Sequence, residues 1–372
     1  MVLAGALGVC GLARGADYIV DPAYKGNPGD NNTYASLPDA VKAVPAGQSA
    51  DKPNRILIKP GTYKQQLTIA ADNVCLIGTS GSADDVIICD DLNARTPKPD
   101  GSGNYGTTGA SSTFIKANHV SVANVTFKNL TPYGGSQAVA LKTTGDEIAF
   151  RNCDFLSFQD TLYPTGGRVY FDHCKISGSV DFIFGNATAV FDHCAIESSH
   201  PGCVTAANTA AATAIGFVFL DCTLAVDDAA AAGSVQLGRP WQYARTDANV
   251  VFIRCKMDAK ISPAGWNPWD QSNDNPGGDS RYAEFGSLDS DGKPSDVSQR
   301  VEWSHQLTAD QAKQFTLGNI FGPGDFWWKG GWPAVWGTRN HPVDSYKDWK
   351  LGGTWDAGAQ LESAELKADA GT

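Results

Sequence analysis

Two aspartates, Asp160 and Asp181, stand at matching distances from two cysteines. Asp160 lies seven residues after Cys153, and Asp181 lies seven residues after Cys174. If the two segments stack as neighbouring coils about 4.8 Å apart, the two carboxyl groups stack as well. Two charged carboxylates that close repel each other, so the pKa of one of them rises. The pair therefore predicts acid/base chemistry, and two solvated turn aspartates are the alternative.

The residues around each aspartate favour chemistry. Apolar and aromatic residues dominate the runs SFQDTLY at 157–163 and GSVDFIFG at 178–185, and they would desolvate the site. The run LGRPW at 237–241 supplies Arg239, which can pair with one carboxylate through two hydrogen bonds and keep it ionised. The other carboxyl group would stay protonated. This division predicts a nucleophile beside an acid/base group.

A repeated segment indicates which elements position these side chains. The pattern Phe-x-x-Cys-x-apolar occurs five times, and a weaker copy lies at 122–127. Apolar and polar residues alternate within each copy, which predicts strands, and the repeats are too short to hold a crossover helix. We therefore expect an all-β, single-stranded right-handed parallel β-helix with one coil per repeat. The cysteines of the five copies are Cys153, Cys174, Cys194, Cys222 and Cys255.

The two ends of such a solenoid need caps. Ser36 precedes a helical run at 40–44 that Pro45 stops, and Thr308 and Gln311 form a capping-box pattern before a helix at 312–317. Coil spacing also makes a disulfide plausible between Cys174 and Cys194. The repeated Asp-His-Cys strings at 172 and 192 suggest a metal as an alternative, but the repeat already explains them.

Composition limits the possible partners. The chain has 372 residues, with 29 Lys and Arg against 40 Asp and Glu, a formal charge of −11. This acidic balance disfavours nucleic acid and anionic membrane surfaces. Residues 1–15 are expected to be a removed secretory signal peptide, and 16–320 the β-helix. The Trp- and Gly-rich tail at 321–372 is expected to pack on the coils, with a separate sugar-binding module as the alternative.

Six motifs in this order resemble those of the pectin methylesterases, or pectinesterases. The resemblance covers about residues 17–320 and is nearest to the bacterial type, which occurs also in fungi and insects, because the loops are long and no plant-type pro-region precedes them. It implies a β-helix, in agreement with the repeat. The motifs are GTY at 61–63, QAVAL at 137–141, QDTLY at 159–163, GSVDFIFG at 178–185, LGRPW at 237–241 and GWNPW at 265–269.

This resemblance implies an activity. The expected reaction hydrolyses the C6 methyl esters of homogalacturonan, which is pectin, to methanol and de-esterified pectate, and so modifies or degrades the cell wall. The family needs no metal or organic cofactor. We expect a secreted, extracellular monomer that binds pectin and neither nucleic acid nor membrane.

The resemblance also implies residue roles. Asp181 matches the family's nucleophile, Asp160 its general acid/base, and Arg239 the residue that orients the nucleophile. Gln137 and Gln159 match the amides that stabilise the oxyanion. The family's disulfide maps onto Cys174 and Cys194. The sugar groove is matched by Trp241, Tyr163, Val180, Phe184, Trp269 and Thr107.

One position departs from the family: Gln65 stands where a glutamate is usual, and its distance from the catalytic motifs indicates packing. Three other functions remain open. The first is another pectin-active β-helix, either a calcium-dependent lyase or a polygalacturonase, which calcium dependence or new reducing ends would reveal. The second is a non-enzymatic sugar-binding β-helix. The third is an esterase for another ester. The absence of a Gly-x-Ser-x-Gly run disfavours an α/β-hydrolase.

Overall fold

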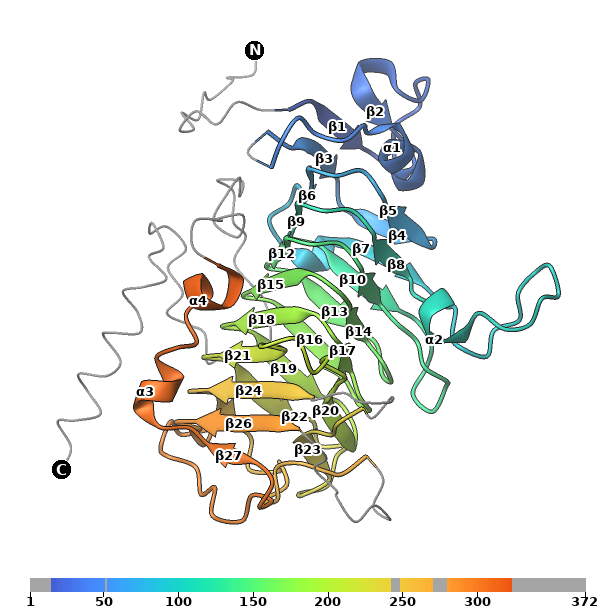
Figure 1. Cartoon of the computed structure of the whole chain (residues 1–372). Helices are drawn as coiled ribbons and strands as arrows, with labels where there is room; N and C mark the ends of the chain where they lie inside the picture. Colours follow the sequence, from blue (N-terminus) through green and yellow to red (C-terminus); the bar gives the residue numbers. More distant parts are fainter. Residues whose placement is uncertain (1–14, 51, 242–247, 270–279, 323–372) are drawn as a thin grey trace.

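Short strands stack coil upon coil into three parallel sheets in this computed structural model (Figure 1). It describes residues 15–50, 52–241, 248–269 and 280–322. The strands pair in parallel from coil to coil, as the predicted right-handed parallel β-helix requires. The expected signal peptide and nearly all of the Trp-rich tail lie outside the described residues.

The largest sheet has twelve strands and contains the phenylalanines of the repeat. Its strands, in spatial order, are β2 (Thr33–Tyr34), β1 (Asp17–Val20), β3 (Asn54–Ile58), β6 (Val74–Gly78), β9 (Val120–Ala123), β12 (Ile148–Arg151), β15 (Arg168–Asp172), β18 (Thr188–Asp192), β21 (Phe217–Leu220), β24 (Asn249–Ile253), β26 (Arg281–Phe285) and β27 (His305–Gln306).

Two smaller sheets complete each coil. The eight-stranded sheet contains β25 (Lys256–Met257), β22 (Thr223–Val226), β19 (Ala195–Ser198), β16 (Lys175–Gly178), β13 (Asp154–Leu156), β10 (Thr126–Asn129), β7 (Val86–Asp90) and β4 (Gly61–Lys64). The seven-stranded sheet contains β23 (Val235–Gly238), β20 (Gly202–Ala207), β17 (Ile183–Gly185), β14 (Leu162–Pro164), β11 (Leu141–Thr143), β8 (Thr113–Ile115) and β5 (Leu67–Ile69).

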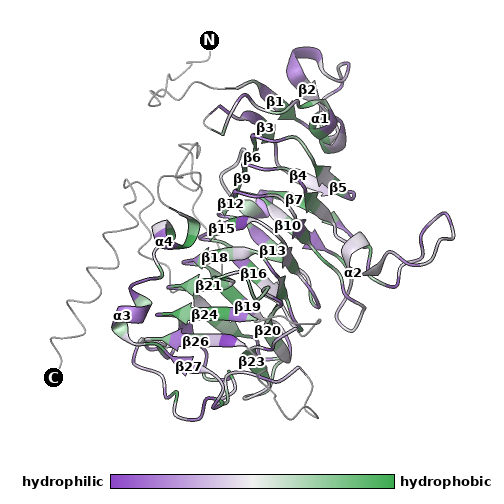
Figure 2. Cartoon of the chain, in the orientation of Figure 1, coloured by the Kyte–Doolittle hydropathy of each residue, from purple (hydrophilic) through white to green (hydrophobic). Residues whose placement is uncertain are grey.

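The repeat's phenylalanines form a continuous stack inside the helix. Ring centroids lie 5.1 Å apart from Phe150 to Phe171, 4.6 Å from Phe171 to Phe191, 4.5 Å from there to Phe219, and 4.4 Å on to Phe252. All five rings are fully buried. Figure 2 shows strands such as β21 and β24 coloured as hydrophobic. The in-register stacking confirms the coil assignment made from the sequence. It also sets the distance between equivalent side chains on successive coils.

The cysteines of the repeat stack beside these rings. Contrary to the expected disulfide, the structure holds Cys174 and Cys194 as thiols. The backbone N–H of Cys174 donates to Cys194 Sγ at 3.4 Å, and Cys194 Sγ contacts the carbonyl of Phe171 at 3.4 Å. The physical reason is that each thiol donates to a backbone carbonyl instead, Cys174 Sγ to Asp172 O and Cys194 Sγ to Phe171 O, both at 3.4 Å.

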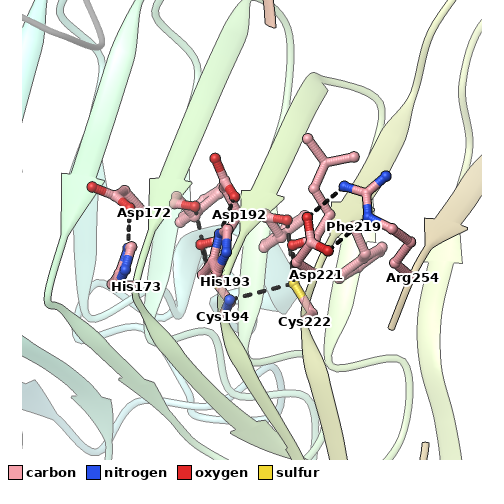
Figure 3. A network of polar contacts seen from close by, with 12 residues as sticks. Asp172, His173, Asp192, His193, Cys194, Phe219, Asp221, Cys222 and Arg254 are labelled. Atoms are coloured by element: carbon pink, nitrogen blue, oxygen red, sulfur yellow. Dashed lines mark hydrogen bonds and ion pairs between the residues drawn. The ribbon is translucent and has the colours of Figure 1, made fainter. Parts of the chain in front are cut away.

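The corners after the large sheet carry a polar network that includes the Asp-His-Cys strings (Figure 3). His193 Nδ1 lies 2.6 Å from Asp192, and Arg254 holds Asp221 through two hydrogen bonds of 2.8 and 2.5 Å. Asp172 pairs with the ring of His173 in the same way. The aspartates are thus satisfied within the protein. Across the described part of the chain, no three potential ligands converge as a metal site would require.

Short helices cap both ends. α1 (Leu37–Ala43) begins at Ser36, whose side chain accepts the N–H of Asp39, which confirms the predicted N-terminal helix. At the other end Thr308 and Gln311 make the predicted capping box, but the helix differs from expectation. It ends after one turn as α3 (Ala309–Ala312), and a second helix, α4 (Leu317–Phe321), follows with its own cap at Thr316.

The remaining elements are short. η1 (Asp30–Asn32) and η2 (Ala83–Asp85) are 3₁₀ turns, and α2 (Gly106–Gly109) belongs to a long segment that projects from the stack between β7 and β8 (Figure 1). Within the described residues, no helix has the length and apolar character needed to cross a membrane.

Candidate active site

A cleft of about 840 Å³ lies against the seven-stranded sheet. It gathers all five polar residues singled out from the sequence and five of the six aromatic or groove residues. Its lining comes from separate coils and from the α2 segment, so the β-helix is what brings these residues together. The lining residues are Tyr105, Gly106, Thr107, Thr108, Gln137, Gln159, Asp160, Tyr163, Asp181, Phe184, Ala206, Asn208, Arg239, Trp241 and Trp269.

Asp160 and Asp181 occupy equivalent positions on adjacent coils. Leu162 and Ile183 are register partners, so the aspartates two residues earlier also lie level with each other. The backbone N–H of Asp160 donates to Val180 O at 3.1 Å, which links the two turns directly. Both aspartates have left-handed backbones, with φ of 64° and 52°. Aspartate tolerates this conformation better than most residues, and corner residues such as Asp221 share it, so it is a turn geometry of the coils.

Arg239 fixes the position of Asp181. It follows β23, and its Nε and Nη2 donate to the two carboxylate oxygens of Asp181 at 2.9 and 2.6 Å. The preceding residue, Gly238, allows this approach, because a Cβ there would lie 2.0 Å from Thr205 Oγ1. The guanidinium carbon of Arg239 also lies 4.4 Å from the ring centroid of Trp269. The ion pair and the ring together hold the arginine in one orientation.

The two carboxyl groups differ in their electrostatic surroundings. Burial and then the negative charge of Asp181 raise the pKa of Asp160 well above its ordinary value. Burial also raises the pKa of Asp181, but the hydrogen bonds and charge of Arg239 oppose that rise. The pKa of Asp160 is thus raised more than that of Asp181, so of the two carboxyl groups Asp160 holds its proton more readily and Asp181 ionises more readily. This is the division between acid and nucleophile expected from the sequence.

Two glutamines stand beside the aspartates. The N–H of Ala138 donates to the backbone carbonyl of Gln159 at 3.0 Å, so Gln137 and Gln159 lie on adjoining coils. Ser136 Oγ donates to the side-chain oxygen of Gln137 at 2.6 Å. This bond leaves the NH₂ group of Gln137 to donate into the cleft. Two amide donors next to a carboxylate can stabilise a developing oxyanion.

Aromatic rings form one wall of the cleft. Tyr163 stacks on Phe184 with centroids 4.1 Å apart, and Trp241 lies 5.8 Å from Phe184. Trp269 keeps 36% of its surface exposed, and Thr107 faces the cleft from α2. Partly exposed rings of this kind suit the faces of sugar rings.

One predicted groove residue lies elsewhere. Val180 lines a separate hollow of about 190 Å³, which also includes Gln159 and the ring of Phe158. Tyr133 borders the same hollow and stacks on His200 with centroids 3.6 Å apart. Val180 thus lines the neighbouring hollow rather than the cleft.

Sequence reasoning missed several residues of the cleft. Tyr105 and Thr108 come from the Gly-rich segment around α2, where no strand periodicity exists, and Asn208 follows β20 without a distinguishing pattern. Tyr105 could have been found only as an aromatic residue in a Gly-rich loop, which is a weak indication of a binding residue. Gln65 lies outside the cleft lining, with its backbone N–H bonded to Cys89 O at 2.9 Å.

Comparisons with known proteins show which family the chain resembles. Residues 27–324 match the model of the Pectinesterase family. The chain is 33% identical over 295 residues to Pectinesterase 31 of Arabidopsis thaliana, covering 78% of this chain and 89% of that protein. It is similar to pectin methylesterase PemA from Erwinia chrysanthemi at 30% identity and a TM-score of 0.71, covering 83% of this chain and 97% of that one. A pectin methylesterase in complex with hexasaccharide VII matches with the same identity, coverage and TM-score.

Proposed function

The chain belongs to the pectinesterase family, and on that basis we propose that it hydrolyses the methyl esters of pectin at Asp160 and Asp181. The observation that carries this proposal is the pair itself. One carboxylate is held by Arg239 at 2.9 and 2.6 Å, and a buried neighbour with a raised pKa lies one coil away. A pair of this kind supplies a fixed nucleophile and a proton donor in one cleft.

In the first half of the reaction, a carboxylate oxygen of Asp181 attacks the ester carbonyl carbon. The carbonyl oxygen becomes negatively charged and accepts hydrogen bonds from the side-chain amides of Gln137 and Gln159. The bond to the methoxy oxygen breaks as Asp160 gives that oxygen its proton. Methanol leaves, and a mixed anhydride joins Asp181 to the sugar acid.

In the second half, Asp160 is a carboxylate and takes a proton from water. The hydroxyl oxygen attacks the anhydride at the sugar carbonyl carbon, and the bond to Asp181 breaks. The galacturonic acid leaves, Asp181 is again ionised and Asp160 again protonated. The scheme uses no metal or organic cofactor. Trp241, Tyr163, Phe184 and Trp269 would hold sugar rings on either side of the reacting ester.

Finer features are part of the same proposal. The bacterial type is supported by the long segment with α2 between β7 and β8. A monomer is part of the proposal because Asp160, Asp181 and Arg239 are brought together within a single β-helix. Secretion, with residues 1–15 removed, is supported by the substrate, since pectin is a polymer of the cell wall. The catalytic domain at 16–320 and a tail at 321–372 complete the proposed organisation.

Methanol release from highly methylated pectin tests the function directly. In EDTA, the wild-type protein should release methanol and Asp181→Ala should release none above background. New reducing ends or unsaturated products without methanol would instead indicate a polygalacturonase or a lyase. Activity on acetyl esters but not on methylated pectin would indicate another esterase.

A further inference from the structure

Two lysines extend the floor of the cleft along the seven-stranded sheet. Lys142 on β11 is the register partner of Tyr163 on β14, and on its other side it pairs with Phe114 on β8. One coil, about 4.8 Å, therefore separates Lys142 from the cleft's Tyr163. Lys116 follows β8, with its ammonium 5.3 Å from the ring of Phe114.

Neither lysine is neutralised. Lys142 Nζ donates to Thr108 Oγ1 at 3.2 Å and lies 4.4 Å from the ring centroid of Tyr163, and both partners are uncharged. Within the described residues, neither Lys142 nor Lys116 forms an ion pair. Some exposed lysines elsewhere do, for example Lys59 with Asp21 and Lys64 with Asp91. Lys142 also feels the charge of Lys116, so the two ammonium groups form a local positive patch in a chain of net charge −11.

The carboxyl groups of the cleft do not cancel the positive charge of the two lysines. Asp181 is balanced by Arg239 at 2.6 Å, and burial favours the protonated form of Asp160. Burial, and then the charge of Lys116, lower the pKa of Lys142, so an anion there would relieve repulsion. Thr108 contacts Lys142 and also lines the cleft, so a chain of sugars in the cleft would continue over the two lysines.

We propose that Lys142 and Lys116 form a binding subsite for the free carboxylate of a galacturonate unit near the ester being cleaved. This inference rests on the proposed function, which supplies the polymer. De-esterification creates such carboxylates, so a partly de-esterified chain would bind better than a fully methylated one. The ammonium groups would form charge-assisted hydrogen bonds with the carboxylate in a half-buried setting.

The probe is fully de-esterified hexagalacturonate. Its affinity is measured by calorimetry, and its inhibition constant in the methanol-release assay, for the wild type and for Lys142→Gln/Lys116→Gln. The matched control is Lys128→Gln, because Lys128 lies on β10 of the eight-stranded sheet, which contributes no residue to the cleft lining. Lys142→Arg/Lys116→Arg retains both charges.

We expect the double glutamine variant to bind hexagalacturonate about tenfold more weakly, as loss of a charge-assisted hydrogen bond would cause. Lys128→Gln should bind as the wild type does, and the arginine pair should keep most of the affinity. Unchanged affinity in the glutamine variant, or an equal loss in Lys128→Gln, would overturn the subsite. If the wild type releases no methanol from any pectin, the proposed function fails, and calorimetry still shows whether the lysines bind the carboxylate.

Discussion

The guanidinium of Arg239 holds both carboxylate oxygens of Asp181, with Nε 2.9 Å from Oδ1 and Nη2 2.6 Å from Oδ2, although the residues are 58 positions apart in the sequence. The same arginine lies over the ring of Trp269, 4.4 Å from its centroid. Arg239 therefore both orients the carboxylate of Asp181 and contacts Trp269, a residue of the groove.

Replacement of the nucleophile should abolish turnover. Asp181→Asn keeps the size of the side chain, and asparagine accepts the left-handed backbone, but an amide cannot attack the ester. We expect kcat to fall by about 10⁴-fold or more, measured as methanol release. Asp221→Asn is a matched control, because Asp221 also has a left-handed backbone and a two-bond pairing with an arginine, Arg254. Equal losses in both variants would contradict the nucleophile assignment.

Changes at Arg239 should move the pH profile. Burial raises the pKa of Asp181 and Arg239 opposes that rise, so removal of the guanidinium raises the pKa further. A smaller fraction of Asp181 is then ionised at a given pH. We expect the acidic limb of kcat/KM to move to higher pH in Arg239→Gln, and less far in Arg239→Lys, which keeps a charge but loses the two-bond geometry. A lower kcat with an unmoved acidic limb would contradict this reasoning.

The glutamines should act on the transition state. Loss of one oxyanion donor typically lowers kcat by about 10²- to 10³-fold. We therefore expect Gln159→Ala and Gln137→Ala to reduce kcat in that range with little change in KM, in steady-state assays of methanol release. Gln66→Ala is a control, because Gln66 bonds to backbone carbonyls of Gly109 and Ser111 outside the lining of the cleft. A rise in KM without a fall in kcat would instead indicate a role in substrate binding.

The stacked coils could be predicted because a single register repeats. Once Cys153 and Cys174 were assigned to equivalent places, the seven-residue offset placed Asp160 level with Asp181, and the structure has this arrangement. The same logic predicted the phenylalanine stack. The repeat predicts where a residue lies on a coil, because equivalent residues of successive repeats occupy equivalent places on successive coils.

Residues outside the periodic part could not be predicted in this way. Val180 faces the neighbouring hollow because a left-handed turn at the next residue changes the direction of the chain, which a strand pattern does not reveal. The α2 segment has no period, so Tyr105 and Thr108 were missed. The Cys174–Cys194 bridge was expected from coil spacing, but both residues are thiols that contact backbone carbonyls, a choice that spacing alone does not reveal.

Asp160 should reduce stability at neutral pH. Burial and the charge of Asp181 raise its folded pKa above the unfolded value of about 3.9. Its contribution to stability is then complete below pH 4 and is lost as pH rises through the folded pKa. We expect Asp160→Asn to lose activity. At pH 7–8 its free energy of unfolding should exceed that of the wild type by about 0.5–2 kcal/mol, seen as a higher melting temperature, and near pH 4 there should be no such gain.

Calorimetric melting temperatures across this pH range provide the measurement for Asp160. Asp172→Asn serves as the opposite control. Burial raises the pKa of Asp172, but His173 and Arg151 outweigh that effect and lower it, so this variant should lose stability at neutral pH. A gain for Asp160→Asn that is the same at pH 4 and pH 8 would show that its cause is not the carboxylate charge.

Removal of Arg300 should destabilise the fold around Glu284, Ser262 and Pro263, which its guanidinium contacts. Glu284 is fully buried, and it accepts Arg300 Nε at 2.7 Å and Ser287 Oγ at 2.9 Å. Arg300→Met leaves this carboxylate buried without its cation, and we expect a loss of about 3–5 kcal/mol in the free energy of unfolding, measured in urea. Glu284→Gln/Arg300→Met should lose less, because no charge stays buried. If the single and double variants lose the same free energy of unfolding, then lost packing rather than the unpaired carboxylate of Glu284 explains the effect.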